Sequence, residues 1–514
     1  MIKRLLIANR GEVALRIVRA CRELGVESVA VYSDPDVHAP HVSAADRSVH
    51  IGPAAAADSY LSATRLLDAA RATGADAVHP GYGFLSENAA FALACEKAGV
   101  VFVGPPSGVI AQMGSKIAAR RLMQIAGVPV VPGETPHDQS DEGIATAARR
   151  VGFPALVKAS AGGGGKGMRR IDDPTQSIDA IQVARREAQA AFGDGMLYVE
   201  RVIDRPRHIE VQIFADAYDH VVHLFERECS VQRRHQKVIE ESPSLLLTSR
   251  LRSRMTDAAV QAARACGYRN AGTVEFLVDA SGGRGTERFY FLEMNTRLQV
   301  EHPVTEQVTG LDIVRAQILI ASGEPLPWLS PSISQRGHAI EARVYAEDPA
   351  RGFLPQAGKL LLYRAPSMPG VRIDSGVAEG SDVPVQYDAL LAKVIATAAT
   401  RDEAIARLIC ALREFPILGV QTNIPFLLRV LDLPRFRAGD IDTGFLDREG
   451  AELAKSASHR VPDAVRDVMT AHNAMLESVV TSRQSPVASL DGEPRATSDE
   501  PRADPWEQLI TWRR

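Results

Sequence analysis

A glycine-rich run follows an apolar segment that ends in Lys158. Residues 161–168 contain five glycines and Lys166. Glycines let backbone N–H groups approach a polyanion closely, and the two lysines add positive charge. A G-x-x-x-x-G-K-[ST] loop is excluded, because Ser160 stands at its first position and Gly167 follows the lysine. We expect a flap between two strands that closes over nucleotide phosphates, with a plain linker as the alternative. The flap residues are Gly162, Gly163, Gly164, Gly165, Lys166 and Gly167.

Two carboxylates and an amide lie in apolar strand sequences further along. Glu293 and Asn295 share one face of a strand, and Glu275 lies on the preceding strand of the same expected hairpin. Buried acids are costly unless their charge is compensated. The pattern therefore predicts a Mg²⁺ site, with salt-bridged acids on an exposed face as the alternative. His208 and His235 have no partner at metal-ligand spacing, so they are interpreted as nucleotide contacts or satisfied histidines.

Basic side chains that suit anions occur in two further places. Arg297 is a planar, bidentate donor for carboxylate, bicarbonate or phosphate, and Glu301 lies close enough to serve as a general base. Residues 232–237 form a basic run that continues an apolar strand and ends in Lys237. An anion site is favoured there over a solvated charged face. Arg343 lies on the polar side of a strand and by itself indicates nothing.

The elements that must position these residues begin with alternating strand and helix signals. Residues 5–8 have the pattern of a buried strand, apolar residues recur at helical spacing over residues 13–24, and Gly25 suits a helix C-cap. A doubly wound parallel sheet is predicted. Dinucleotide binding is disfavoured, because the first turn holds one glycine and no G-x-G-x-x-G. Further strands are expected at 28–32, 75–79 and 100–103.

After residue 115 the pattern changes to a helix at 116–127 followed by many strands. The expected strands are 154–159, 196–203, 208–216, 221–232, 271–278 and 288–295, the last two joined by a turn at 281–285. A third region begins near residue 336, with strands at 339–346, 358–363 and 370–374. It closes with a helix that Thr400 and Glu403 begin as a capping box. Beyond residue 448 we expect a helix at 462–480 and a mobile, proline-rich stretch at 482–504.

The bulk composition limits the class of protein. The chain has 514 residues, 45% of them hydrophobic and 24% charged, which is typical of a soluble enzyme of two to four domains. A net charge of −4 without a basic concentration argues against a nucleic-acid partner, and no apolar segment approaches the ~20 residues of a membrane span. The N-terminal apolar run is too short for a signal peptide. Five cysteines without a C-x-x-C pair favour a reducing cytoplasm over disulfides or zinc.

Four long motifs, in family order, resemble those of biotin carboxylase, in particular the biotin carboxylase portion of acyl-CoA carboxylase α subunits. They are residues 79–88, the glycine run, residues 232–237 and residues 293–306, and the resemblance covers residues 1 to about 447. It implies a multidomain α/β and α+β fold. The implied parts are an N-terminal Rossmann-like domain at 1–115, an ATP-grasp domain at 116–335 with a mobile lid at about 130–204, a C-terminal biotin carboxylase domain at 336–447, and a poorly ordered tail at 448–514.

The resemblance also implies roles for individual residues. For ATP these are Lys116, Lys158, the flap residues, Glu200, Arg201 and Val202 at the adenine edge, His208, Gln232, His235 and Leu277. For Mg²⁺ or Mn²⁺ they are Glu275, Glu293 and Asn295. For bicarbonate they are Lys237, Arg297, Gln299 and the backbone of Val300, and for biotin they are Tyr82 and Arg343.

The implied reaction joins bicarbonate to biotin at the expense of ATP. Glu301 would remove the bicarbonate proton so that carboxyphosphate forms, and Arg343 would stabilise the enolate-like oxygen of biotin. No Met-Lys-Met attachment sequence occurs in the chain, so we expect biotin on a separate carrier protein and a carboxyltransferase as a further partner. A homodimer is what relatives suggest.

Two other functions remain open at this point. A carboxylase of the carbamoyl-phosphate-synthetase or purine-pathway type would keep the ATP-grasp scaffold but change the acceptor. A non-catalytic subunit would bind nucleotide without turnover. The tyrosine-containing motif at 79–88 and Arg343 favour biotin, and the full set of charged residues argues against a non-catalytic role.

Overall fold

The computed structural model describes residues 1–160, 167–281, 287–329, 332–455 and 470. Two compact units divide the chain, Met1–Leu453 and Ala454–Arg514, and every element named below belongs to the first. Some expectations fall outside the described residues. These are flap residues 162–166, most of the turn at 281–285, and the elements expected at 462–480 and 482–504.

The N-terminal region forms a five-stranded parallel sheet in the order β3-β2-β1-β4-β5, which confirms the predicted doubly wound architecture. Leu5 and Ile7 pack into one core and Leu6 into another, because alternate residues of β1 face opposite sides of the sheet. Gly25 ends α1 in the left-handed conformation, as expected (φ 68°). The elements are β1 (Arg4–Ile7), α1 (Gly11–Leu24), β2 (Glu27–Ser33), α2 (Pro40–Ala44), β3 (Arg47–Gly52), α3 (Ala63–Thr73), β4 (Ala77–His79), α4 (Ala89–Lys97), β5 (Val101–Phe102) and α5 (Ser107–Gly114).

The strand order of this sheet reverses between β1 and β4. In parallel α/β sheets, ligands bind beyond the carboxyl ends of the strands at such a switch point. Here the loops that follow β1 and β4 are tied together, because the Asn9 side-chain amide donates to the carbonyls of Pro80 and Tyr82 at 2.7 Å each. The fold thus holds Tyr82 where a ligand site is expected.

A small antiparallel sheet forms next, in the order β6-β9-β7-β8, with its own hydrophobic core. Ile144 and Ile181 from its two helices pack with Val157 and Val199 from its strands. The small sheet therefore has a hydrophobic core of its own within the first unit. Its elements are β6 (Gly133–Glu134), α7 (Asp141–Val151), β7 (Ala155–Ala159), β8 (Met168–Ile171), α8 (Ser177–Phe192) and β9 (Leu197–Arg201), and α6 (Lys116–Ile125) precedes them.

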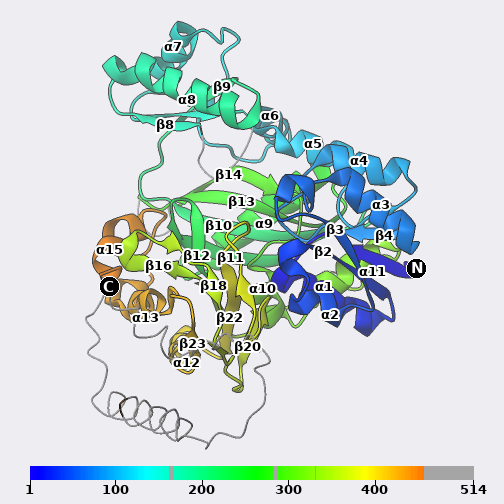
Figure 1. The fold of residues 1–514 in the computed structure, drawn as a ribbon. Coiled ribbons are helices and arrows are strands. Elements are labelled where there is room, and N and C mark those ends of the chain that lie inside the picture. The colour runs from blue at the N-terminus through cyan, green and yellow to red at the C-terminus, as the bar shows by residue number, and fades with distance from the viewer. Residues whose placement is uncertain (161–166, 282–286, 330–331, 456–469, 471–514) are drawn as a thin grey trace, which may run out of the picture. The chain divides into compact units, whose positions relative to one another are not determined.

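An eight-stranded antiparallel sheet follows, in the order β14-β13-β10-β11-β12-β15-β22-β20 (Figure 1). Helix α9 (Ser249–Ala265) packs on one face, against residues such as Ile209 and Val211. The alternate residues of that strand, His208 and Glu210, lie on the other face and are buried as well. The strands are β10 (Arg207–Ala215), β11 (Val221–Arg233), β12 (Gln236–Ser242), β13 (Asn270–Asp279), β14 (Arg288–Asn295), β15 (His338–Tyr345), β20 (Val371–Ser375) and β22 (Leu390–Ala398).

The boundary expected near residue 336 does not divide this sheet. Strand β12 pairs with β15, so strands from both sides of that boundary form one continuous ladder. All eight residues of β15 are buried, and Arg343 lies on the polar side of the strand, as expected, where it donates to Glu240 and Glu301.

Helices and short strands complete the unit. Helix α12 begins with the predicted capping box, in which Thr400 and Glu403 each accept from the other's backbone N–H. The strand expected at 358–363 is two separate pieces, β18 (Gly358–Lys359) and β19 (Leu362–Tyr363). The other elements are α10 (His302–Thr309), α11 (Ile313–Ala321), β16 (Glu347–Asp348), β17 (Leu354–Pro355), β21 (Asp382–Val383), α12 (Arg401–Arg413), β23 (Ile417–Leu418), α13 (Ile424–Asp432), α14 (Pro434–Arg437) and α15 (Phe445–Leu453).

The segment that leaves the small sheet is held by the end of the unit. Arg205 donates to Asp442 at 2.9 Å, and Arg207 donates to the carbonyl of Gly439 at 2.9 Å. The Thr443 N–H donates to the carbonyl of Pro206, also at 2.9 Å. Residues 205–207 are therefore fixed to residues 439–443 by both side-chain and backbone contacts.

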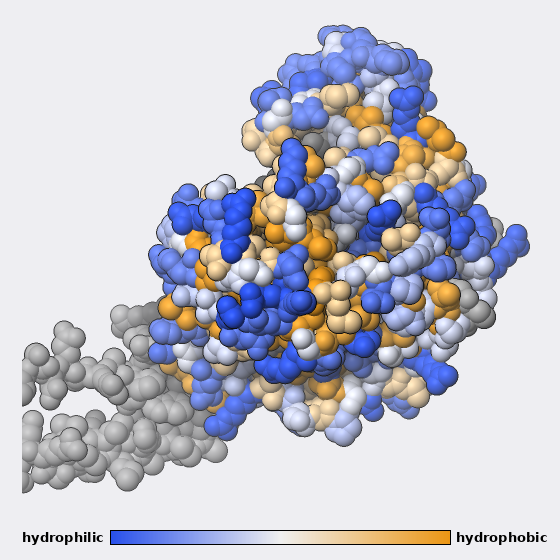
Figure 2. All heavy atoms as spheres, turned by 90° about the vertical axis from the view of Figure 1, so that its right-hand side faces the viewer, coloured by the Kyte–Doolittle hydropathy of each residue, from blue (hydrophilic) through white to orange (hydrophobic). Residues whose placement is uncertain are grey.

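Membrane-spanning helices are absent from the described part of the chain, since none of its helices is both long and apolar enough to cross a bilayer. Hydrophilic residues cover most of the face seen in Figure 2, with hydrophobic residues grouped near its middle. None of the five cysteines is in a disulfide, and Cys410 is the exposed one.

One buried ion pair in the large sheet allows a stability prediction. Glu241 of β12 accepts from Arg401 at 2.6 Å and contacts His338 at 2.7 Å. Burial alone would raise the pKa of Glu241, but His338 and Arg401 outweigh burial and lower the pKa from 4.5 to about 2. Because the folded pKa is depressed, the stabilisation is complete above the unfolded value and is lost as the pH falls through the folded one.

We therefore expect Glu241→Gln to lower the free energy of unfolding by about 3 kcal/mol at pH 7, measured by urea denaturation. The deficit should shrink as the pH falls below 4.5. Glu134→Gln, which breaks an exposed pair with Arg150, is the control and should cost less than about 1 kcal/mol. An equal cost for both variants would contradict this account.

Candidate active site

A cavity of about 870 Å³ lies between the parallel sheet, the small sheet and the polar face of the large sheet. It brings together every predicted site residue among those described, apart from Gly167. The predicted residues that line it are Tyr82, Lys116, Lys158, Glu200, Arg201, Val202, His208, Gln232, His235, Lys237, Glu275, Leu277, Glu293, Asn295, Arg297, Gln299, Val300, Glu301 and Arg343.

Gly167 has a packing role instead of a place in the cavity wall. Its φ is +70°, and a Cβ there would lie 2.9 Å from the Cβ of Ala159. The neighbouring flap residues 162–166 lie outside the described part of the chain. The prediction of a flap is therefore untested for those five residues. At Gly167 a side chain is disfavoured by the positive φ and by the nearby side chain of Ala159.

Lys237 is the centre of the charged cluster on the cavity floor. Its ammonium donates to Glu210 at 2.5 Å, to Glu275 at 2.9 Å and to Glu301 at 2.5 Å. Burial alone would lower the pKa of Lys237, but these three carboxylates hold it well above its usual value. One ammonium thus compensates the charge of carboxylates on two strands and a turn.

Glu301 is completely buried and faces two cations. Besides Lys237, the Arg343 guanidinium donates to its second oxygen at 3.1 Å. Burial would raise the pKa of Glu301, but Lys237, Arg343 and Arg227 outweigh it and hold the pKa well below its usual range. Glu301 is therefore a carboxylate at neutral pH, which is the form that a general base requires.

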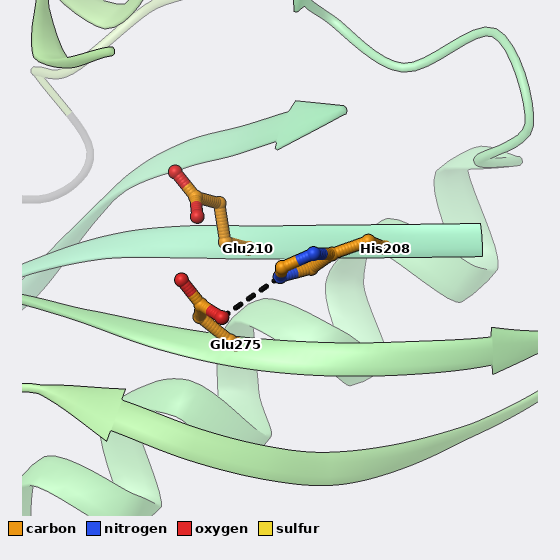
Figure 3. Close-up of side chains that lie close together, drawn as sticks. All are labelled: His208, Glu210 and Glu275. Carbon is orange, nitrogen blue, oxygen red and sulfur yellow. Dashed lines mark hydrogen bonds and ion pairs between the residues drawn. The ribbon is translucent and has the colours of Figure 1, made fainter. Parts of the chain in front are cut away.

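Figure 3 shows how β10 and β13 bring a histidine and two acids together. His208 and Glu275 are 2.8 Å apart, and Glu210 stands opposite Glu275 in the strand register. Burial would lower the pKa of His208, but Glu275 outweighs it and raises the pKa. Because Lys237 donates to both acids, protein groups compensate the negative charge of Glu210 and Glu275.

The predicted metal residues meet as the hairpin pattern required. Glu275 pairs with Glu293 in the β13–β14 register, and the Asn295 amide donates to Glu275 at 2.7 Å. Glu275 is 4% exposed, which excludes a solvated sheet face. Burial, and then Glu275, raise the pKa of Glu293, so the two acids disfavour each other's charge. A divalent cation relieves that repulsion, and this donor set therefore fits Mg²⁺.

Two lysines project toward the same region from α6 and β7. Lys158 is held by Glu200 at 2.8 Å, whereas Lys116 is 3.8 Å from Glu293. Burial lowers the pKa of Lys116, and Glu293 only partly opposes that effect. An entering polyphosphate would supply the anion that Lys116 lacks.

The segment predicted to lie at the adenine edge uses two of its backbone N–H groups within the fold. The Glu200 side chain is engaged by Lys158 and Arg120, and the N–H groups of Arg201 and Val202 donate to Pro132 and Pro154. In the described part of the chain no carbonyl accepts from the N–H of Ile203, which also lines the cavity. The available donor at this edge is therefore one residue beyond the segment we predicted.

Arg297 lies at the opposite end of the acid pair. It donates to Glu87 at 2.8 Å, to Gln299 at 3.2 Å and to Asn295 at 3.2 Å. Val300 contributes its carbonyl, which accepts from Lys393 at 2.8 Å. These contacts fix a planar cation beside Lys237 and Glu301, in the arrangement that suits a small oxyanion.

The basic run at 232–237 divides in two. Gln232, His235 and Lys237 line the cavity, with the turn between β11 and β12 reversing the chain at positive φ. Arg233 instead stacks on Phe353 at 3.7 Å and lies 3.4 Å from Glu347. Only part of the run therefore forms the predicted anion site.

Several acids that contact the cavity residues were missed by the sequence reasoning. Glu210 could have been found, because polar residues alternate with apolar ones along β10. Glu87 lies inside the motif at 79–88. Glu240, which binds Arg343 at 2.6 Å, and Glu12, which accepts from Tyr82, had no signal of their own in a single sequence.

Comparisons with known proteins agree with this geometry. Family models match residues 1–110 (biotin carboxylase, N-terminal domain), 115–329 (carbamoyl-phosphate synthase L chain, ATP binding domain) and 341–448 (biotin carboxylase C-terminal domain). Biotin carboxylase 1 of Bacillus subtilis (strain 168) is 50% identical over 447 residues, which is 87% of this chain and 98% of that protein. The alpha subunit of mitochondrial methylcrotonoyl-CoA carboxylase from Arabidopsis thaliana is 46% identical over 94% of this chain, which spans 65% of that subunit.

Solved structures give the same result. The biotin carboxylase domain dimer of Hydrogenobacter thermophilus 2-oxoglutarate carboxylase, in complex with MgADP, ADP and bicarbonate, has a TM-score of 0.84 at 43% identity, covering 89% of this chain and 100% of that one. Campylobacter jejuni biotin carboxylase has a TM-score of 0.84 at 44% identity, covering 87% and 99%. With three matching family models and relatives that it covers almost end to end, this chain belongs to the biotin carboxylase family.

Proposed function

We propose that the chain catalyses the ATP- and bicarbonate-dependent carboxylation of biotin, the first half-reaction of an acyl-CoA carboxylase. The Lys237 cluster carries this proposal, because it holds a deprotonated acid, Glu301, against Arg343 and in one cavity with Arg297. That arrangement can bind a small oxyanion, remove its proton and stabilise a second developing anion. Membership of the family adds the acceptor, biotin.

In the first step Glu301 takes the bicarbonate proton, while Lys237 and Arg297 hold the anion. The freed oxygen attacks the γ-phosphorus, and the bond to the bridging oxygen breaks, giving carboxyphosphate and ADP. When Glu301 becomes neutral, Lys237 keeps its contacts with Glu210 and Glu275, so the ammonium stays in place. Lys116 and Lys158 balance charge on the phosphates.

Glu275, Glu293 and Asn295 would hold Mg²⁺ or Mn²⁺. The ion supplies charge neutralisation for the phosphate oxygens when it is bound. The N–H of Ile203 would donate to the adenine ring, with Leu277 against its face.

In the second step carboxyphosphate separates into CO₂ and phosphate, and the phosphate takes the ureido proton of biotin. Arg343 stabilises the resulting enolate-like oxygen until the nitrogen captures CO₂. Tyr82, held at the switch point by Asn9, lies by the entering biotin. Exclusion of water protects carboxyphosphate, which is the role we assign to the small sheet and its flap.

The organisation of the chain follows from the same proposal. Residues 1–115, 116–335 and 336–447 would be its domains, with a lid at about 130–204. Biotin would arrive on a carrier protein and leave for a carboxyltransferase, neither of which these residues supply. A homodimer is supported by the dimeric relative from Hydrogenobacter thermophilus, and a cytoplasmic location by cysteines without disulfides.

One assay distinguishes biotin carboxylation from the other two candidate functions. ATP cleavage that requires bicarbonate and is stimulated by free biotin supports this function. Cleavage stimulated by ammonia or a purine precursor would support the other carboxylases, and the absence of cleavage would support a non-catalytic subunit.

Glu301→Gln tests the general base. The amide keeps the shape of the side chain but accepts no proton, so bicarbonate-dependent ATP cleavage should fall by about 10²–10⁴-fold. ADP affinity, measured by calorimetry, should change little, because the adenine edge and the lysines are untouched. Turnover near the wild-type rate would remove Glu301 from this role.

Glu293→Gln tests the metal site. Loss of one carboxylate ligand should raise the Mg²⁺ concentration for half-maximal ATP cleavage by roughly tenfold or more. A Mg²⁺ titration of initial rates measures this, with Glu134→Gln in the small sheet as the control that leaves it unchanged. An unaltered titration curve for Glu293→Gln would contradict the assignment.

A further inference from the structure

Two buried acids beside the cavity have no place in the mechanism above. Glu240 of β12 and Glu341 of β15 stand directly opposite each other in the strand register, and both are 0% exposed. Directly opposed residues of an antiparallel pair lie on the same face of the sheet. Two carboxylates at such a position repel each other strongly unless cations or protons compensate them.

Protein cations compensate only part of this charge. Glu240 accepts from Arg343 at 2.6 Å through one oxygen. Its other oxygen and both oxygens of Glu341 have no hydrogen-bond partner among the described residues. Lys393, the nearest lysine on β22, is engaged by the Val300 carbonyl at 2.8 Å and by Glu12 at 3.0 Å.

The charged groups that face the two acids are few. They are Arg343 on β15, Glu301 at the start of α10, Lys237 on β12 and Lys393 on β22. Burial, only partly opposed by Arg343, raises the pKa of Glu240 to about 7. Burial also raises the pKa of Glu341 well above its usual value. The two carboxyls therefore retain at least one proton at neutral pH as a coupled pair.

One proton can satisfy two of the three unpartnered oxygens. Glu240 accepts a hydrogen bond from Arg343, whereas Glu341 accepts none from any cation that the structure describes, so the proton is expected on Glu341. A hydroxyl on Glu341 can donate to the free oxygen of Glu240, which leaves the other Glu240 oxygen as the acceptor for Arg343. This arrangement removes the repulsion without a further cation.

We propose that Glu240 is a positioning residue for Arg343, and that a proton on Glu341, shared with Glu240, preserves the charge with which Glu240 holds the guanidinium. The inference rests on the proposed function, in which Arg343 stabilises the biotin enolate. Arg343 has two carboxylate partners, Glu301 and Glu240. Glu301 is neutralised when it takes the bicarbonate proton, so Glu240 is the partner that remains when biotin reacts.

Infrared spectroscopy tests the proton without reference to activity. The difference spectrum between wild type and Glu341→Gln at pH 7 should contain the carbonyl-stretch band of a protonated carboxylic acid, lost in the variant. Absence of that band would show that Glu341 is ionised and would overturn the proposal. This result is independent of whether the protein carboxylates biotin.

Kinetics test the positioning role. Glu240→Gln should lower the kcat of biotin-stimulated ATP cleavage by at least about tenfold, with a smaller change in the KM for biotin. The slow bicarbonate-dependent cleavage without biotin should stay within about twofold of wild type. Glu240→Asp, which keeps the charge, should recover part of the rate. Glu341→Gln, which imitates the protonated acid, should stay close to wild type.

Glu241→Gln is the matched control, because Glu241 is the next residue of β12 and is also buried, but pairs with Arg401. It should lower stability without changing the ratio of biotin-stimulated to basal cleavage. The proposal is overturned if Glu240→Gln keeps that ratio, or if Glu341→Gln lowers it as much as Glu240→Gln. Lack of biotin stimulation in the wild type would instead refute the proposed function, and the infrared result would still decide the protonation.

Discussion

Compensation of buried charge around Lys237 is the constraint on which the rest of the structure depends. Three carboxylates from β10, β13 and the turn before α10 converge on its ammonium at the wall of the cavity. Arg227, itself 0% exposed, fixes the arrangement from behind by donating to Glu210 at 2.5 Å and to Gln212 at 2.9 Å. Charges buried in this way are tolerated when nearly all their hydrogen-bonding capacity is used. A shift of one strand by a single residue would leave several of them uncompensated.

The strand periodicity of the sequence was enough to predict the metal residues of this site, whereas residues such as Lys116 and Gln299 followed only from the family resemblance. Alternation placed Glu293 and Asn295 on one face, and the hairpin brought Glu275 opposite, as the register shows. The parallel sheet followed from the alternation of apolar runs and helical spacing, and the capping box at Thr400 from four residues. Those features depend on neighbours in the chain or on adjacent strands, which sequence patterns report directly.

What could not be predicted depends on contacts between distant parts of the chain. Glu240 meets Arg343, 103 residues away, only because β12 and β15 are neighbours in the large sheet. The close contact of Gly167 with Ala159 had no signal in the sequence either, and its place in the phosphate flap stays a prediction. The N–H groups of Arg201 and Val202 are occupied because the carbonyls of Pro132 and Pro154 accept from them. Single-sequence patterns hold no information on such pairings.

The contacts of residues 205–207 with residues 439–443 restrict how the small sheet can move. Two chain segments join the small sheet to the rest of the unit. The second of them, which follows β9, is fixed at residues 205–207 by its contacts with residues 439–443. If the small sheet rotates, the change in backbone dihedral angles should therefore be concentrated in the few residues before Arg205, which would act as a hinge. The loop 439–443 between α14 and α15, remote in sequence from every reacting group, thereby fixes the point from which the small sheet could rotate.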